Sequence, residues 1–278
     1  MKNQNAWITI VVLGLLVSMA AQTALAAPVS VVGGLTREAT LQPGAKTEGR
    51  IVLRNSTDQP QEVKVYQTDY LFWADGRNQY GEPGSTPRSN ARWIVHTPQQ
   101  LTVPPRATES VYYTIQVPAQ EDLRGTYWSM LMVEPISAET LEPPKPEEGK
   151  VTIGIRSVMR YAIQIVTHIG DTGTRDLKFA DKQLLVEEGK PTLRLDLENT
   201  GERWLRPLIW AELYDQQGLS LGRFEGGRFR IYPGCSVRYH IDLSEVPAGK
   251  YRALIVADNG DEYVFGAQYD LDLREEGQ

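Results

Sequence analysis

The chain has 278 residues, a formal net charge of −6 and a sequence pI near 5.3. This acidic balance, without any basic run, excludes a nucleic-acid-binding surface and a polybasic membrane footprint. The single cysteine, Cys235, excludes an intramolecular disulfide, and we expect it to be a buried or half-buried small residue.

The amino terminus has the pattern of a secretory signal peptide. Lys2 supplies a positive charge, residues 8–21 are almost uninterruptedly apolar, and Ala24-Leu25-Ala26 is the small-x-small pattern of a cleavage site. The apolar run is short for a membrane span of about 20 residues. We therefore predict a signal peptide over residues 1–26 and a mature protein that is periplasmic, or alternatively at the cell surface, and does not span the membrane.

Short alternating segments dominate the rest of the chain. They are rich in Val, Ile and Tyr, which suit a half-buried pleated surface, and pairs such as Pro43-Gly44, Asp75-Gly76 and Asn259-Gly260 separate them. No window after the amino terminus predicts an amphipathic helix, so the predicted class is all-β. The clearest predicted strands are 49–54, 62–67, 110–117, 193–197, 236–243 and 251–256.

One order of strands occurs twice. The segment 110–115 leads to Pro118 and then to 125–131, and the segment 236–241 leads to Pro247 and then to 249–255. Earlier in each half, an alternating strand ends in Asn and a hydroxyl residue, at Asn55-Ser56 and Asn199-Thr200. The repeat predicts two tandem immunoglobulin-like sandwiches, over residues 27–170 and 171–278.

Two irregular stretches interrupt the first half. Residues 72–90 are rich in Gly, Pro, Ser and Asn, and predict a hairpin tip at Asp75-Gly76 followed by a long surface loop, which either binds a partner or merely connects strands. Residues 137–150 hold three prolines among several glutamates. We interpret them as a loop within the first domain, because an alternating strand begins at Val151 and continues to Ile169.

Motifs of catalysis are missing from the sequence, so we do not expect an enzyme. It has no Gly-x-Ser-x-Gly, His-Glu-x-x-His, phosphate loop or Cys-x-x-Cys. We expect His96, His168 and His240 to be surface residues of strands, and the glutamates of 139–148 to form a solvated loop without the spacing of a calcium site. We predict no metal and no cofactor.

The order of these features resembles the PapD-like periplasmic chaperones of pilus assembly. The resemblance covers mainly residues 28–170. It rests on the first two strands over 29–55, the proline-flanked loop 97–105, the penultimate strand at Tyr127-Trp128-Ser129-Met130, and a donor-like strand over 151–160. It implies a chaperone that binds an exported, pilin-like subunit by strand addition, in which an exposed edge pairs with an incomplete sandwich of the partner.

The resemblance also implies the binding residues. Val151, Ile153, Ile155 and Val158 would contact the partner strand, and Arg37 and Arg160 would anchor the partner's terminal carboxylate. The alternative from the residues alone is that the apolar row faces the core of the first domain and the two arginines are ordinary surface charges.

A weaker resemblance connects the chain to the WxL-interacting surface proteins of Gram-positive bacteria. It rests on Pro43-Gly44, the 72–90 loop and the Pro-Gly-x-Ser and Pro-Ala-Gly-x-Tyr runs of the second half. It implies a non-catalytic envelope or cell-surface adaptor that binds protein or cell-wall glycan through its sandwich faces or the 72–90 loop.

Overall fold

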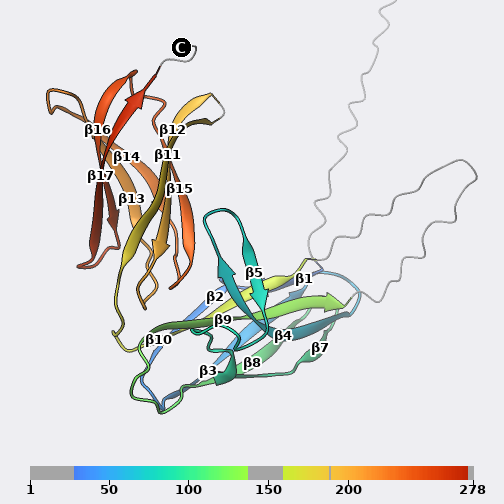
Figure 1. The fold of residues 1–278 in the computed structure, drawn as a ribbon. Coiled ribbons are helices and arrows are strands. Elements are labelled where there is room, and N and C mark those ends of the chain that lie inside the picture. Colours follow the sequence, from blue (N-terminus) through green and yellow to red (C-terminus); the bar gives the residue numbers. More distant parts are fainter. Residues whose placement is uncertain (1–27, 137–158, 188, 275–278) are drawn as a thin grey trace, which may run out of the picture.

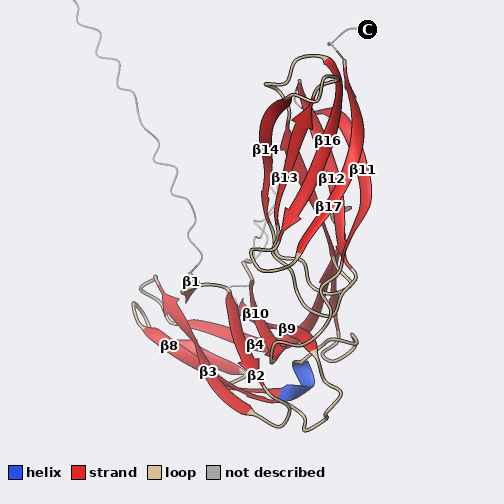
Figure 2. Ribbon diagram, turned by 90° about the vertical axis from the view of Figure 1, so that its left-hand side faces the viewer, coloured by secondary structure: helices blue, strands red, loops and turns tan. Residues whose placement is uncertain are grey.

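A computed structural model describes residues 28–136, 159–187 and 189–274 of the chain. The predicted all-β class is confirmed: the described residues form strands arranged in two β-sandwiches, with one short 3-10 turn at Ala91–Trp93. Figures 1 and 2 show the sandwiches as two lobes that meet end to side. The predicted signal peptide lies outside the described residues, and no helix among them is long and apolar enough to cross a membrane.

The first sandwich consists of two sheets, and the amino-terminal strand region contributes β1 to one sheet and β2 to the other. One sheet has the order β1-β3-β8-β6, and the other has the order β2-β10-β9-β4-β5, with β7 also paired to β4. The first contains β1 (Val29–Val32), β3 (Lys46–Asn55), β8 (Thr108–Gln116) and β6 (Ile94–Thr97). The second contains β2 (Thr36–Leu41), β10 (Tyr161–Ile169), β9 (Gly125–Ile136), β4 (Gln61–Phe72), β5 (Asn78–Gly81) and β7 (Gln100–Val103).

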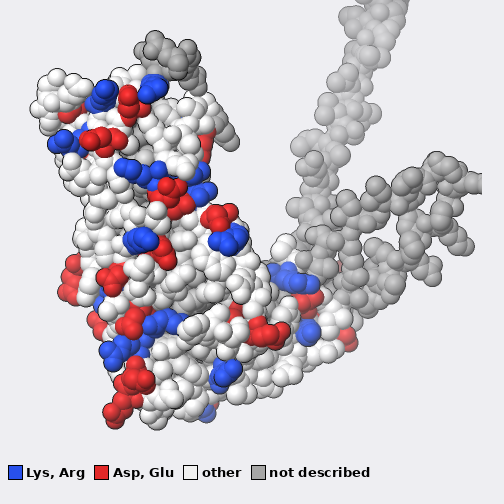
Figure 3. Space-filling model, in the orientation of Figure 1, with Lys and Arg blue, Asp and Glu red and all other residues white. Residues whose placement is uncertain are grey.

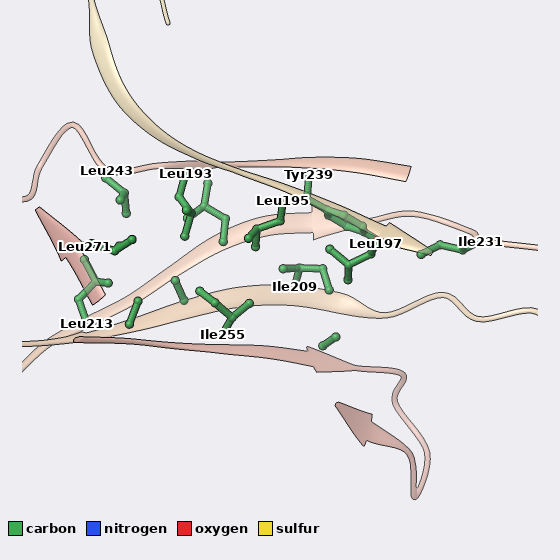
Figure 4. Close-up of a cluster of buried hydrophobic side chains, with 14 of the residues drawn as sticks. Leu193, Leu195, Leu197, Ile209, Leu213, Ile231, Tyr239, Leu243, Ile255 and Leu271 are labelled. Atoms are coloured by element: carbon green, nitrogen blue, oxygen red, sulfur yellow. The ribbon is translucent and has the colours of Figure 1, made fainter. Parts of the chain in front are cut away.

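The second sandwich has the strand arrangement of an immunoglobulin-like domain. Its sheets have the orders β11-β12-β15 and β14-β13-β16-β17, so the fourth strand of this domain pairs with the third and not with the fifth. Leu195, Ile209 and Ile255 from the two sheets meet in its buried core (Figure 4). The strands are β11 (Leu177–Glu187), β12 (Lys190–Asn199), β13 (Leu208–Tyr214), β14 (Ser220–Arg228), β15 (Ser236–Asp242), β16 (Gly249–Asp258) and β17 (Val264–Leu273).

The repeated asparagine makes equivalent hydrogen bonds in both domains. Asn55 and Asn199 are buried at the ends of β3 and β12. The amide of Asn55 donates to the carbonyls of Gln59 and Val103, at 2.7 and 3.0 Å, and that of Asn199 donates to the carbonyls of Arg203 and Ile231, at 2.8 and 2.9 Å. Each asparagine side chain thus links the end of its strand to carbonyls of a neighbouring segment, and its own buried amide is satisfied there. The sequence repeat is therefore a repeat of structure.

The two sandwiches are packed tightly against each other. The indole of Trp128 on β9 stacks on the Tyr232 ring, with centroids 4.6 Å apart, and the main-chain N–H of Thr126 donates to the Glu202 carbonyl at 2.9 Å. A Cβ on Gly125 would lie 2.1 Å from that carbonyl oxygen, so only glycine fits there. One buried cluster includes Trp128 and Val166 together with the core of the second domain.

Candidate strand-docking edge

The first strand of the chain changes sheets, and this opens an edge. β1 pairs antiparallel with β3 in one sheet, and β2 pairs in parallel with β10 in the other. The chain crosses between the sheets over Gly33–Leu35, where Gly33 has a φ of +88° that favours glycine. The strand that covers β10 therefore begins only at Thr36.

The register shows which part of β10 is uncovered. Residues 161–163 pair with Val133, Met132 and Leu131 of β9, whereas pairing with β2 starts at Gln164, opposite Thr36. No described strand lies on the other side of residues 161–163. Among the described strands, the start of β10 is thus a sheet edge.

The backbone alternation identifies the free groups of this edge. The N–H of Gln164 donates to the Leu35 carbonyl at 2.8 Å, toward β2. Because successive residues of a strand point their main-chain groups to opposite sides, the N–H and C=O of Ala162 face the same way as those of Gln164. Ala162 therefore presents one donor and one acceptor where β2 has not yet begun.

Exposed apolar side chains flank the crossing and precede β10 in the chain. Val32 and Leu35, on either side of the two glycines, are 39% and 44% exposed, and Met159, just before β10, is 53% exposed. A strand that paired with Ala162 would bring apolar side chains to these residues. The exposed row is typical of an edge that binds an extended segment.

The second domain contributes a polar cluster at the point where β2 joins β10. Arg230 donates to Glu38 at 2.6 Å, to Thr36 at 3.2 Å and to the side-chain oxygen of Gln164 at 3.3 Å. The Tyr232 hydroxyl donates to the same Gln164 oxygen at 2.6 Å. The guanidinium of Arg230 also lies 4.3 Å from the centroid of the Trp204 ring. This cluster links both strands to the second domain.

His168 lies in the same junction, and the prediction that it is a surface residue is wrong. It is 5% exposed, stacks on Trp204 with centroids 5.5 Å apart, and has its Nδ1 3.0 Å from the Thr126 hydroxyl. Burial, and then the charge of Arg203, lower its pKa to about 4, although Glu38 opposes this shift. The second domain buries His168. The alternation of polar and apolar residues within one strand does not predict burial by another domain.

The other two histidines lie in or beside strands. The Nε2 of His96 is 3.2 Å from the Val65 carbonyl, and the half-exposed His240 lies 3.3 Å from Glu187. Among the residues that the structure describes, no group of three or more His, Cys, Asp or Glu is arranged to hold a metal ion. Cys235 is fully buried, as expected, and burial raises the pKa of its thiol to about 11.

The predicted binding residues fall into two groups. Val151, Ile153, Ile155 and Val158 lie outside the described residues, and the described strand that follows them begins at Tyr161. Arg37 and Arg160 are described, and the structure does not bring them together. Arg37 is opposite Ile165, five positions along from Arg160, which corresponds to roughly 16 Å along the strand.

Each of the two arginines has acceptors of its own. Arg160 forms an ion pair with Glu134 at 3.2 Å, and Arg37 donates to the carbonyls of Gly34 and Thr36. They do not form one two-arginine fork in this structure. The arginine that does reach both β2 and β10 is Arg230, which sequence reasoning missed because it lies in the other domain, nearly 200 residues from β2.

The 72–90 loop folds back onto the protein. Asp75-Gly76 forms the predicted hairpin tip between β4 and β5, and the N–H of Ala74 donates to Ser236 of the second domain at 2.9 Å. The buried carboxylate of Asp69 accepts hydrogen bonds from Gly84, Thr86 and Ser89, at 3.1, 2.8 and 2.5 Å. The 72–90 loop is therefore held both by the second domain and by a buried carboxylate of its own domain.

The charges of the surface are mixed. Figure 3 shows Lys and Arg interspersed with Asp and Glu over both lobes on the face it presents. The observed ion pairs follow this pattern, as in Arg238 with Asp196 at 2.7 Å and Arg106 with Asp58 at 2.7 Å. This face offers no large field of one sign.

No protein-family model matches the chain, and no curated protein does. Among solved structures it is similar to a chaperone–tip adhesin complex of CFA/I fimbriae, at 14% identity and a TM-score of 0.48, over 89% of this chain and 100% of the other. It is also similar to the class 5 fimbriae chaperone CfaA, at 11% identity and a TM-score of 0.47, over 86% and 98% of the two chains.

A third similar structure is the CupB2 chaperone of Pseudomonas aeruginosa, at 11% identity and a TM-score of 0.37, over 88% of this chain and 100% of that one. At this distance the likeness transfers no partner or activity to the present chain. The free edge at Ala162 is a feature of the chain's own geometry.

Proposed function

We propose that this protein is a periplasmic, chaperone-like protein that captures an extended segment of an exported, pilin-like subunit by strand addition to β10. The observation that carries the proposal is the edge at residues 161–163, which is paired with β9 on one side and has no described strand on the other. A guest strand would take up the free N–H and C=O of Ala162 and end where β2 begins.

The surroundings of the edge support a guest of apolar, alternating sequence. Val32, Leu35 and Met159 are exposed beside it. The predicted row Val151, Ile153, Ile155 and Val158 precedes it in the chain, and we propose that this row extends the same edge. Arg160, directly before residues 161–163, would contact the middle of such a guest, and Arg37, just past the point where the guest ends, would contact its end, so the two arginines would not share one carboxylate.

Proline at position 162 tests this mechanism directly. Ala162→Pro removes the N–H that would bond the guest, but it removes no hydrogen bond to β9, since that N–H points away from β9. We expect the variant to fold with a melting temperature close to that of the wild type and to lose its partner. The measurement is a pull-down from envelope extract, with the bound proteins identified by mass spectrometry.

Ala162→Gly is the matched control, because it alters the same side chain and keeps the N–H; it should retain the partner. The pair Ile153→Asp with Ile155→Asp should also abolish capture if the predicted row contacts the guest. Equal recovery of the same exported subunit by the wild type and Ala162→Pro would refute strand addition at this edge.

A further inference from the structure

The free edge of β10 ends at the first residue pair, or rung, of its ladder with β2. A side chain of the second domain contacts both residues of that rung. The first pair of the β2–β10 ladder is Thr36 with Gln164. Arg230 donates from one nitrogen, Nη1, to the side chains of both, at 3.2 and 3.3 Å. The same guanidinium therefore touches each member of the rung at which the edge closes.

Other contacts hold Arg230 in this position. Its Nη2 is 2.6 Å from Glu38, the next residue on the same face of β2, and its guanidinium lies over Trp204. Its Nε is buried without a partner among the described residues, so the side chain accepts an unsatisfied donor in order to lie here. Tyr232, two residues further, donates to Gln164 as well.

We propose that Arg230 is a positioning residue that clamps the first rung of the β2–β10 ladder and so sets where the free edge of β10 ends. Without the clamp, the start of β2 separates from β10 more often, and the uncovered stretch lengthens from residues 161–163 toward Gln164 and Ile165. That this longer uncovered stretch would change the pairing of a guest strand rests on the function proposed above, but the clamp itself is a property of the protein alone.

The far end of the same ladder provides an internal comparison. There the N–H of Gly170 donates to the Leu41 carbonyl at 2.9 Å, and the Gly170 carbonyl accepts from Arg203 at 2.9 Å. Two arginines of the second domain thus hold opposite ends of one strand pair. A clamp at the near end predicts a local effect that does not extend to Gly170.

Amide hydrogen exchange of the free protein tests the clamp. In Arg230→Met, which keeps the apolar stem and removes the donors, we expect the Gln164 amide to exchange on the order of tenfold faster, with little change at Gly170. Arg238→Met is the matched control, because Arg238 makes a bidentate pair with Asp196 inside the second domain. It should change neither amide.

Thr36→Val is a milder second variant, which removes one acceptor of the clamp and keeps the shape of the side chain. It should accelerate exchange at Gln164 in the same direction and by less. Unchanged exchange at Gln164 in both variants, or equal acceleration at Gln164 and Gly170, would overturn the clamp. If Ala162→Pro still captures a partner while Arg230→Met shows the local acceleration, strand addition is wrong and the clamp stands.

Discussion

At the scale of single residues, His168 makes the stability of the protein dependent on pH. Its pKa is about 4 in the folded protein, against an ordinary value of 6.5. As the pH falls below 6.5, the unfolded chain takes up the proton first, so the free energy of unfolding decreases until the pH reaches about 4. Integrated between pH 7 and pH 5, this loss is about 2 kcal/mol.

Urea unfolding at pH 7 and pH 5 measures this effect in the wild type and in His168→Gln. The variant should lose most of the difference between the two pH values, since its side chain does not titrate. His240→Gln, at a half-exposed histidine, is the control and should keep the wild-type difference. An unchanged pH dependence in His168→Gln would show that other groups cause it.

At the scale of elements, the 82–90 stretch depends on one buried carboxylate. Asp69 on β4 is 1% exposed and receives its hydrogen bonds from that stretch. We expect Asp69→Ala to release the stretch and to speed tryptic cleavage after Arg88 on the order of tenfold. Asp58→Ala, which removes an exposed carboxylate paired with Arg106, should leave this cleavage rate unchanged. Mass spectrometry of timed digests would follow both.

The sequence predicted the elements with strong alternation. The predicted strands 49–54, 62–67, 193–197 and 251–256 lie within β3, β4, β12 and β16. β14 was not predicted, because Gly222, Gly226 and Gly227 interrupt its pattern, and β5, β6 and β7 have only four residues each. The division of the first strand into β1 and β2 depends on pairing between distant segments, which a local pattern does not contain.

For the candidate site, the sequence predicted the strand that forms the edge but not the side chains of the second domain that contact it. The stretch that ends in β10 was identified, whereas Arg230 and Tyr232 were not, since they reach Gln164 only after the two domains pack. Arg37 and Arg160 were paired by resemblance, and the register separates them by five positions. Burial by another domain, as at His168, is likewise invisible in a strand pattern.

At the scale of the whole molecule, Trp128 couples the two sandwiches. It stacks on Tyr232, and its Nε1 donates to the Tyr70 carbonyl at 2.8 Å. We expect Trp128→Ala to cost about 3 kcal/mol of stability and to loosen the relative orientation of the domains. The distance distribution between spin labels at Val95→Cys and Leu219→Cys, two highly exposed positions in different sandwiches, should broaden.

Trp93→Ala is the control, because the Trp93 ring packs at a tilt of 43° against the Tyr127 ring within the first domain, with centroids 4.6 Å apart. It should reduce stability without broadening the distance distribution. A distribution as narrow in Trp128→Ala as in the wild type would show that the backbone contact at Gly125 and the Arg230 cluster are sufficient to hold the domains.

The buried thiol of Cys235 has a practical consequence for spin-label distance measurements. A sulfhydryl with a pKa of about 11 and no solvent access is almost entirely un-ionised at neutral pH, whereas it is the ionised thiolate that attacks maleimide or methanethiosulfonate reagents. Newly introduced cysteines would therefore be modified selectively. Fluorophores or nitroxides can be attached to the native background, without first replacing Cys235 and risking a void in the second sandwich.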